Sequence, residues 1–144
     1  MTSPPEIAEL FAKSLDEDDF ERARQYLSDE ACYDIGDETL RGPDAILASY
    51  RESTERAHRL LDGIRYESIV NVDEAGQVSI RYLDHISHAG VSFTHQCCQH
   101  LGFDEESRIN HIRHEDLPGE PERLKAFFEQ VGLTAAFAGA ECGD

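Results

Sequence analysis

The stretch QVSIRYLDHISHAGVSFTHQCCQHLGF, residues 77–103, predicts a long β-hairpin that turns at Ala89-Gly90. Alternate residues of a strand point to opposite faces of a sheet. One face of the hairpin then carries Val78, Ile80, Tyr82, Asp84 and Ile86 from the first arm, and Val91, Phe93, His95, Cys97, Gln99, Leu101 and Phe103 from the second. This face is apolar at its ends and titratable near its middle. It therefore indicates either a buried network whose polar groups hydrogen-bond to one another or a pocket.

The turn also predicts the register of the two arms. If Ala89-Gly90 is a two-residue loop, Asp84 lies directly opposite His95. Tyr82 then lies opposite Cys97. A carboxylate that contacts an imidazole orients its tautomer and raises its pKa, which makes a general base suited to neutral pH. We therefore expect Asp84 and His95 to be within hydrogen-bonding distance.

Size and charge limit the classes of partner. The 144 residues are 40% hydrophobic and suit one domain, residues 1–144, with a core of about 6–131 and a tail over 133–144. Thirteen Lys and Arg against thirty Asp and Glu give a net charge of −17, which repels nucleic-acid phosphates and anionic membranes. The N-terminus lacks a signal-peptide pattern, and no apolar run approaches the roughly 20 residues of a membrane span. We expect a cytoplasmic protein that binds neither nucleic acid nor membrane.

The four cysteines lack the spacing of a disulfide framework. They are Cys32, Cys97, Cys98 and Cys142. The neighbours Cys97 and Cys98 point to opposite faces of the same strand. Four free thiols are the expectation.

The other elements place helices before most of the sheet. In order, we expect helices beginning after Ser3 and near Phe20, a strand over 31–35, a loop over 36–41, a helix opened by Gly42-Pro43-Asp44, strands over 64–72 and 108–116, and a helix over about 121–131. Strands that are apolar on one face need a cover. The sequence thus predicts an α+β domain in which helices cover an antiparallel sheet and enclose a cavity.

Three motifs carry a resemblance to a known family. They are LSDEACY at 27–33, LRGPDAI at 40–46 and GFDEESRI at 102–109. With the order of elements, they resemble the nuclear transport factor 2-like superfamily, SnoaL-like (polyketide cyclase, dehydratase and isomerase-like) group, over about residues 6–131. The resemblance implies a cone-shaped curved sheet with N-terminal helices on its concave face, and a homodimer. Because the superfamily contains both enzymes and non-catalytic proteins, the fold does not choose a reaction.

The catalytic positions of two enzyme types in the superfamily are largely substituted. Matching the motifs places Phe11, Ile35 and Gln99 where steroid delta-isomerase-like members have their catalytic tyrosine and two aspartates. Limonene epoxide hydrolase-like members have an Arg-x-Asp where this chain has Tyr82-Leu83-Asp84, and a second aspartate where it has His114. Only Asp84 is retained.

The length of the loop before the last strand determines which side chains of that strand face the cavity. A four-residue loop over 104–107 pairs Cys97 with His114 and His95 with Asp116. The concave set is then Tyr82, Asp84, His95, Cys97, Gln99, Ile112, His114 and Asp116, and the convex face receives His85, Cys98 and His100. A three- or five-residue loop would instead turn His111, Arg113 and Glu115 toward the cavity.

The first hypothesis is a lyase, isomerase or cyclase that acts on a small molecule. His95 is the base, Asp84 orients it, and His114 or Tyr82 is the acid. The ligand would contact further side chains of the pocket: Tyr50, Cys97, Gln99, Phe11, Ile112 and Asp116.

The second hypothesis is a non-catalytic module that binds a ligand or assembles as a dimer. Its mixed convex face suits a two-fold interface and carries Arg81, Leu83, His85, Thr94, Gln96, Cys98 and His100. We expect no cofactor. His95, Cys97, His114 and Asp84 are ligand types that zinc accepts, but short ligand spacings are missing, so we expect no metal either.

Overall fold

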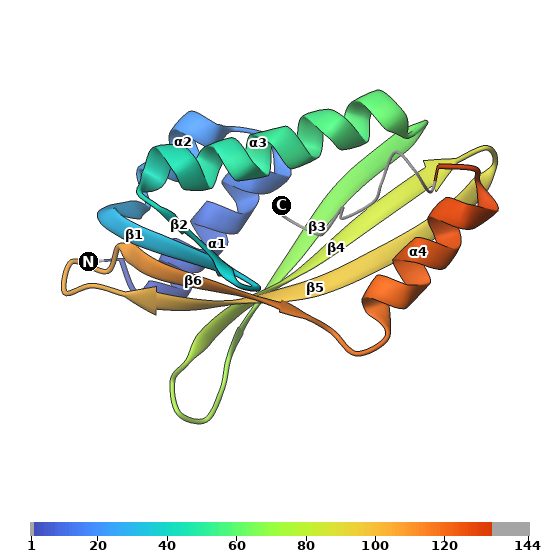
Figure 1. Cartoon of the computed structure of the whole chain (residues 1–144). Coiled ribbons are helices and arrows are strands. Elements are labelled where there is room, and N and C mark those ends of the chain that lie inside the picture. The colour runs from blue at the N-terminus through green and yellow to red at the C-terminus, as the bar shows by residue number, and fades with distance from the viewer. Residues whose placement is uncertain (1, 134–144) are drawn as a thin grey trace.

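The computed structural model describes residues 2–133 and shows an α+β fold. The elements are α1 (Pro4–Asp16), α2 (Phe20–Arg24), β1 (Leu27–Ile35), β2 (Glu38–Arg41), α3 (Pro43–Leu60), β3 (Gly63–Val72), β4 (Val78–His88), β5 (Val91–Phe103), β6 (Ile109–Asp116) and α4 (Glu120–Gln130). The strands form one sheet in the order β2-β1-β6-β5-β4-β3. Figure 1 shows α1, α2 and α3 on one side of this sheet, and α4 beside one end of β5.

Local signals place the helices. Ser3 and Glu6 form a reciprocal capping box at the start of α1, where the sequence predicts that a helix begins. Pro43 opens α3 directly after Gly42, whose φ of 89° suits glycine. Each of these helices turns an apolar stripe toward the sheet. Phe11 and Ile46 are fully buried in the resulting core.

The central hairpin has the predicted register. Ala89 and Gly90 both have positive φ, 51° and 80°, which is the geometry of a two-residue turn that matches the twist of its strands. Asp62 accepts a hydrogen bond from the backbone N–H of Ala89 at 2.8 Å and so ties the turn to the end of α3. Asp84 is therefore the direct partner of His95.

The predicted pairing of β5 with β6 is wrong by two residues, although the predicted facing is right. Cys97 pairs with Asp116 rather than His114, and β6 ends there, so His95 has no partner on β6. The loop is one residue longer than expected, because Phe103 pairs with Ile109, and a bulge next to Gly102 adds a second residue. Each of these changes shifts the pairing by one residue, and the two together leave the same side chains of β6 on the same face of the sheet. Ile112 accordingly stays in the core.

The first two strands also differ from the prediction. β1 begins at Leu27 rather than residue 31, and part of the expected loop over 36–41 forms β2. β1 lies parallel to β6, so the sheet is mixed rather than wholly antiparallel. The join is made where the N–H of Ile109 donates to the carbonyl of Tyr26 at 2.8 Å. Partners so distant in sequence are not specified by local pattern.

Cysteine chemistry differs from the expectation at one position. Cys97 is disulfide-bonded, so four free thiols is wrong. Cys32 and Cys98 are free. Cys142 and most of the expected tail lie outside the described residues. None of the helices within residues 2–133 combines the length and apolar composition needed to cross a bilayer.

Candidate functional site

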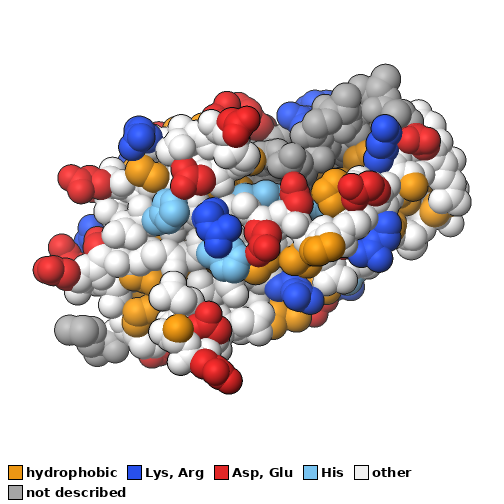
Figure 2. All heavy atoms as spheres, turned by 60° about the horizontal axis from the view of Figure 1, so that its bottom comes forward, with side chains coloured by type: hydrophobic (Ala, Val, Ile, Leu, Met, Phe, Trp, Pro, Cys, Tyr) orange, Lys and Arg blue, Asp and Glu red, His pale blue; other side chains and the backbone are white. Residues whose placement is uncertain are grey.

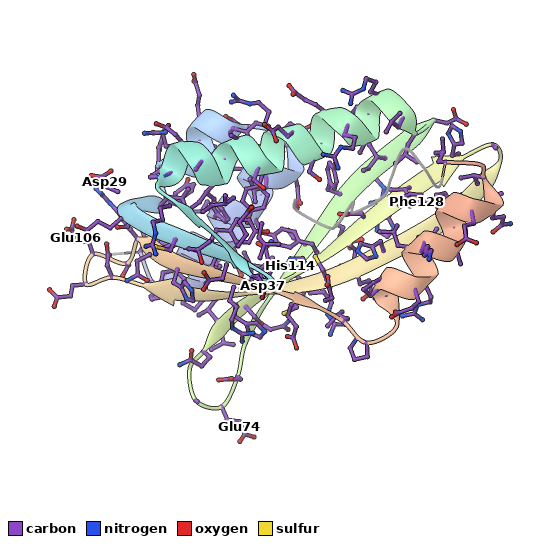
Figure 3. The ribbon with its side chains drawn as sticks, viewed as in Figure 1. Asp29, Asp37, Glu74, Glu106, His114 and Phe128 are labelled. Carbon is purple, nitrogen blue, oxygen red and sulfur yellow. The ribbon has the colours of Figure 1, made fainter. Side chains whose placement is uncertain are left out.

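A cavity of about 90 Å³ lies between the helices and the concave face of the sheet. Its walls come from α1, α2, α3 and α4 and from strands β3, β4 and β5. Most of the lining is apolar and includes Leu15, Ala57, Ile64 and Phe128. Figure 3 shows Phe128 on α4, at the far end of the molecule from β1. One water needs only about 10–15 Å³, so the cavity has room for a small organic molecule.

Asp84 brings a carboxyl group into this apolar lining. It sits in the middle of a cross-strand row, with Tyr66 on β3 and His95 on β5 as its direct partners. Burial, and secondarily the negative charge of Asp16, raise the pKa of Asp84 to about 7. Its side chain is only half-buried by accessible surface, because it faces the cavity. Among the described residues it has no hydrogen-bond partner.

His95 lines the same cavity and is 3% exposed. Neither ring nitrogen has a hydrogen-bond partner within residues 2–133. Burial lowers the pKa of His95, and the opposing charges of Glu120 and Asp116 only partly offset this effect. His95 is therefore a neutral imidazole at pH 7. Its free nitrogens can donate one hydrogen bond and accept another.

The expected hydrogen bond between Asp84 and His95 is not formed, although both residues lie in the expected positions. The charge that acts on Asp84 comes from Asp16 on α1, whereas those that act on His95 come from α4 and β6. The two side chains thus lie in different electrostatic surroundings, although both line the cavity. Strand twist allows direct partners to diverge in this way.

The hydroxyl of Tyr82 is a third polar group of the cavity. It is buried without a hydrogen-bond partner in the part of the chain that the structure describes. Burial is the main reason why the pKa of Tyr82 is raised well above its usual value. Tyr82 therefore remains a hydrogen-bond donor at neutral pH. Unpartnered buried polar groups are costly, and the side chains of Tyr82 and His95 both bring such groups to one small cavity.

A hydrogen-bonded rim on one side of the cavity was missed by sequence analysis. The hydroxyls of Tyr66 and Thr54 are 2.7 Å apart, and Thr54 donates to Asp18 at 3.3 Å. Asp16 accepts from Ser68 at 2.7 Å. The acidic run from Asp16 to Asp19 follows α1, which packs on β3 and brings Asp16 against the cavity.

Gln99 and Tyr50 form a structural network rather than open donors. The Tyr50 hydroxyl donates to Gln99 at 2.7 Å, and Gln99 donates to the Tyr33 hydroxyl at 2.8 Å. The rings of Tyr33 and Tyr50 stack 5.5 Å apart. Gln99 is fully buried, and Tyr50 lines the cavity with its hydroxyl engaged. This set orders the core beside the cavity.

The remaining predicted site residues do not line the cavity. Phe11 and Ile112 are fully buried core residues, and Cys97 is buried beside them. His114 contacts the carboxylate of Asp116 at 2.9 Å. Figure 3 shows His114 nearer the middle of the sheet than Phe128. The structure therefore brings together only Asp84, His95, Tyr82 and Tyr50 among the predicted residues.

Glu120 supports the His95 end of the cavity and was also missed. Only 3% of it is exposed, and it accepts a hydrogen bond from the backbone N–H of Gln96 at 2.8 Å. Arg123 pairs with the same carboxylate at 2.8 Å. Because β6 stops opposite Cys97, the Gln96 N–H has no strand partner there. Glu120 thus replaces the missing strand and anchors α4.

The architecture is the nuclear transport factor 2-like fold. A putative polyketide cyclase from Pseudomonas putida is similar, with a TM-score of 0.62 at 13% identity over 91% of this chain and 99% of that chain. An NTF2-like protein of unknown function from Exiguobacterium has a TM-score of 0.51 at 19% identity, over 74% of this chain and 91% of its own.

A de novo designed protein with a curved β-sheet has a TM-score of 0.57 at 18% identity, over 88% of this chain and 95% of the designed chain. The likeness therefore concerns the fold and not an activity. The sequence matches no family model and no curated protein.

Proposed function

We propose that the protein binds a small, largely apolar carbonyl compound in this cavity and catalyses a proton transfer at the carbon next to the carbonyl. The class of reaction is that of a lyase, isomerase or cyclase. The observation that carries the proposal is the Asp84 carboxyl, which lies in an apolar cavity without a hydrogen-bond partner among the described residues and has a pKa of about 7. General bases act best when their pKa is near the working pH.

Asp84 takes the role of base because no carboxylate contact activates His95. At pH 7 about half of the Asp84 population is ionised, and the apolar surroundings keep that carboxylate reactive. Removal of a proton from the substrate carbon leaves an enolate and a protonated Asp84. The same carboxylic acid then returns the proton to a neighbouring atom. This exchange needs no other reactant.

Tyr82 and His95 are suited to the negative charge that develops on the substrate oxygen. Both remain uncharged at neutral pH, and both carry an unengaged polar hydrogen or lone pair in the cavity. A hydrogen-bond donor aimed at the developing oxyanion lowers the barrier by about 3–4 kcal/mol in well-organised sites. Tyr82 is the donor to this oxygen. The neutral imidazole of His95 orients the substrate by a hydrogen bond to a second polar group of the substrate.

The charge around the cavity defines the substrate further. Asp16 and Asp18 lie on one wall, and Arg56 is the only basic side chain among the lining residues. A carboxylated or phosphorylated substrate would meet net repulsion there. A neutral ketone or aldehyde suits the site better.

The test is hydrogen–deuterium exchange at the α-carbon of cyclohexanone and 2-tetralone in D₂O, followed by proton NMR. We expect the protein to accelerate exchange with a pH–rate profile that rises through about pH 7, as Asp84 ionises. Asp84→Asn should abolish the acceleration. Tyr82→Phe should reduce it by about 10²-fold, as the loss of one oxyanion donor does.

The matched control is Asp37→Asn, which removes the same charge from an exposed loop. It should exchange both ketones at the wild-type rate. Equal exchange by wild type and Asp84→Asn would contradict the proposal. Chemical-shift changes at the cavity residues without any exchange would favour the second hypothesis, a ligand-binding module of the same fold.

A further inference from the structure

The convex face of the sheet carries a cluster of three different metal-ligand types. Cys98 and His100 lie two residues apart on β5, and Glu115 is the direct partner of Cys98 on β6. One donor atom from each residue lies within 4.8 Å of the others. Figure 2 shows histidine, acidic and basic side chains close together on this face. We propose that the Cys98, His100 and Glu115 cluster binds a divalent ion of the zinc type.

The distances fit tetrahedral coordination after small side-chain movements. His100 Nε2 lies 3.9 Å from Cys98 Sγ and 2.7 Å from Glu115 Oε1. With ordinary zinc bond lengths, tetrahedral ligands would be about 3.6 Å apart for sulfur and nitrogen and about 3.4 Å apart for nitrogen and oxygen. Each donor has to move by less than about 1 Å. A water molecule completes the fourth position, as in open zinc sites.

The backbone beneath the cluster is rigid and preorganised. β5 and β6 are the two central strands of the six-stranded sheet. Residues two apart on a strand share a face, so the register alone keeps the Cys98 and His100 side chains on the same side as Glu115. Little ordering is needed on binding.

The chemistry of the donors indicates zinc rather than magnesium or calcium. A thiol and an imidazole are poor ligands for hard cations and good ligands for zinc or cobalt. Burial raises the pKa of the Cys98 thiol, and the nearby charges of Arg81 and Arg113, which also oppose a cation, lower it only in part. Binding of the ion releases the Cys98 proton to solvent, and the resulting thiolate and the Glu115 carboxylate together balance the two positive charges of the ion.

The cluster was not expected from sequence because its members are split between strands. Cys98 and His100 were placed correctly on the convex face, but the predicted register did not bring Glu115 beside Cys98. The two-residue shift of β6 does so. Because these side chains are on the opposite face from the cavity, the proposal is independent of the proposed function.

The test is titration of the untagged chain with Co²⁺ under argon, followed by displacement with Zn²⁺. We expect one ion per chain, a near-ultraviolet charge-transfer band from the Cys98 thiolate, and the strong visible bands of tetrahedral cobalt. Cys98→Ser should remove the charge-transfer band. Glu115→Gln and His100→Gln should each weaken Co²⁺ binding by about tenfold or more. Even the loss of a residue that only hydrogen-bonds to a metal ligand lowers metal affinity by about this factor.

Two variants serve as matched controls. Cys32→Ser removes the other described free thiol, and His111→Gln removes a second histidine–carboxylate pair, formed with Asp34 at 2.6 Å. Both should bind Co²⁺ like wild type. The proposal is overturned if the wild-type chain shows no charge-transfer band, or if the band survives Cys98→Ser. Circular dichroism establishes that every variant is folded.

Discussion

Asp84 and His95 are direct partners on β4 and β5, yet their side chains do not hydrogen-bond to each other. Each instead presents free polar atoms to one apolar cavity. A structural pair would satisfy itself, because unpaired polar groups in a protein interior cost free energy. The separation of the two side chains therefore favours a site that completes its hydrogen bonds with a ligand.

Replacement of Asp84 should make the fold more stable at alkaline pH. The folded pKa, about 7, lies above the ordinary 3.8, so the folded chain holds a proton that the unfolded chain releases between about pH 4 and pH 7. Stability thus falls as pH rises through this window, by up to about 4 kcal/mol. Asp84→Asn should remove most of this loss and raise the free energy of unfolding by about 2–4 kcal/mol at pH 8.

Urea unfolding at pH 5 and pH 8 measures this effect. Asp37→Asn, at an exposed position, should follow the wild-type pH dependence. An Asp84→Asn variant with the same pH dependence as wild type would show that Asp84 titrates normally.

His95→Gln should leave the melting temperature unchanged or higher. Neither ring nitrogen has a hydrogen-bond partner in residues 2–133, so the change removes no bond. Loss of one partner of a buried ion pair would instead cost about 3–5 kcal/mol. Thermal melts distinguish the two outcomes before any substrate is known. A midpoint many degrees lower would identify His95 as a structural residue.

Gln99→Leu should destabilise the fold strongly. The side chain accepts from Tyr50 and donates to Tyr33, and all three residues are buried. The substitution disrupts both bonds, and each polar group left unsatisfied costs about 1–3 kcal/mol. We expect a total loss of about 2–4 kcal/mol in urea unfolding. A loss below about 1 kcal/mol would mean that the network contributes little.

We propose a homodimer through the convex sheet face. That face combines the half-buried Leu83 with polar pairs such as His85 and Glu67, whose atoms are 2.9 Å apart, a mixture that suits a wet two-fold interface. Light scattering at micromolar concentration should report twice the chain mass of 16.2 kDa. Leu83→Glu should shift the protein to monomer. A wild-type sample of monomers alone would refute the interface.

The local sequence pattern was sufficient to predict the helices, the central hairpin and the side chains that the hairpin places on the covered face. Two residues of positive φ at Ala89-Gly90 set the register of β4 and β5, and alternation then placed Tyr82, Asp84 and His95 on the covered face. These features depend on neighbours in the chain, whose geometry a short turn determines. The α+β class followed from the same patterns.

Tertiary packing decided which of these residues form the site. Asp16 acts on Asp84 only because α1 packs across β3, and Gln99 is occupied only because α3 brings Tyr50 against it. The longer loop and the bulge beside Gly102 together moved Glu115 next to Cys98 without a change of facing. Such contacts join segments far apart in sequence, and side-chain direction within a twisted sheet depends on what packs above it. Sequence alternation therefore defined the faces, and long-range packing defined the chemistry on them.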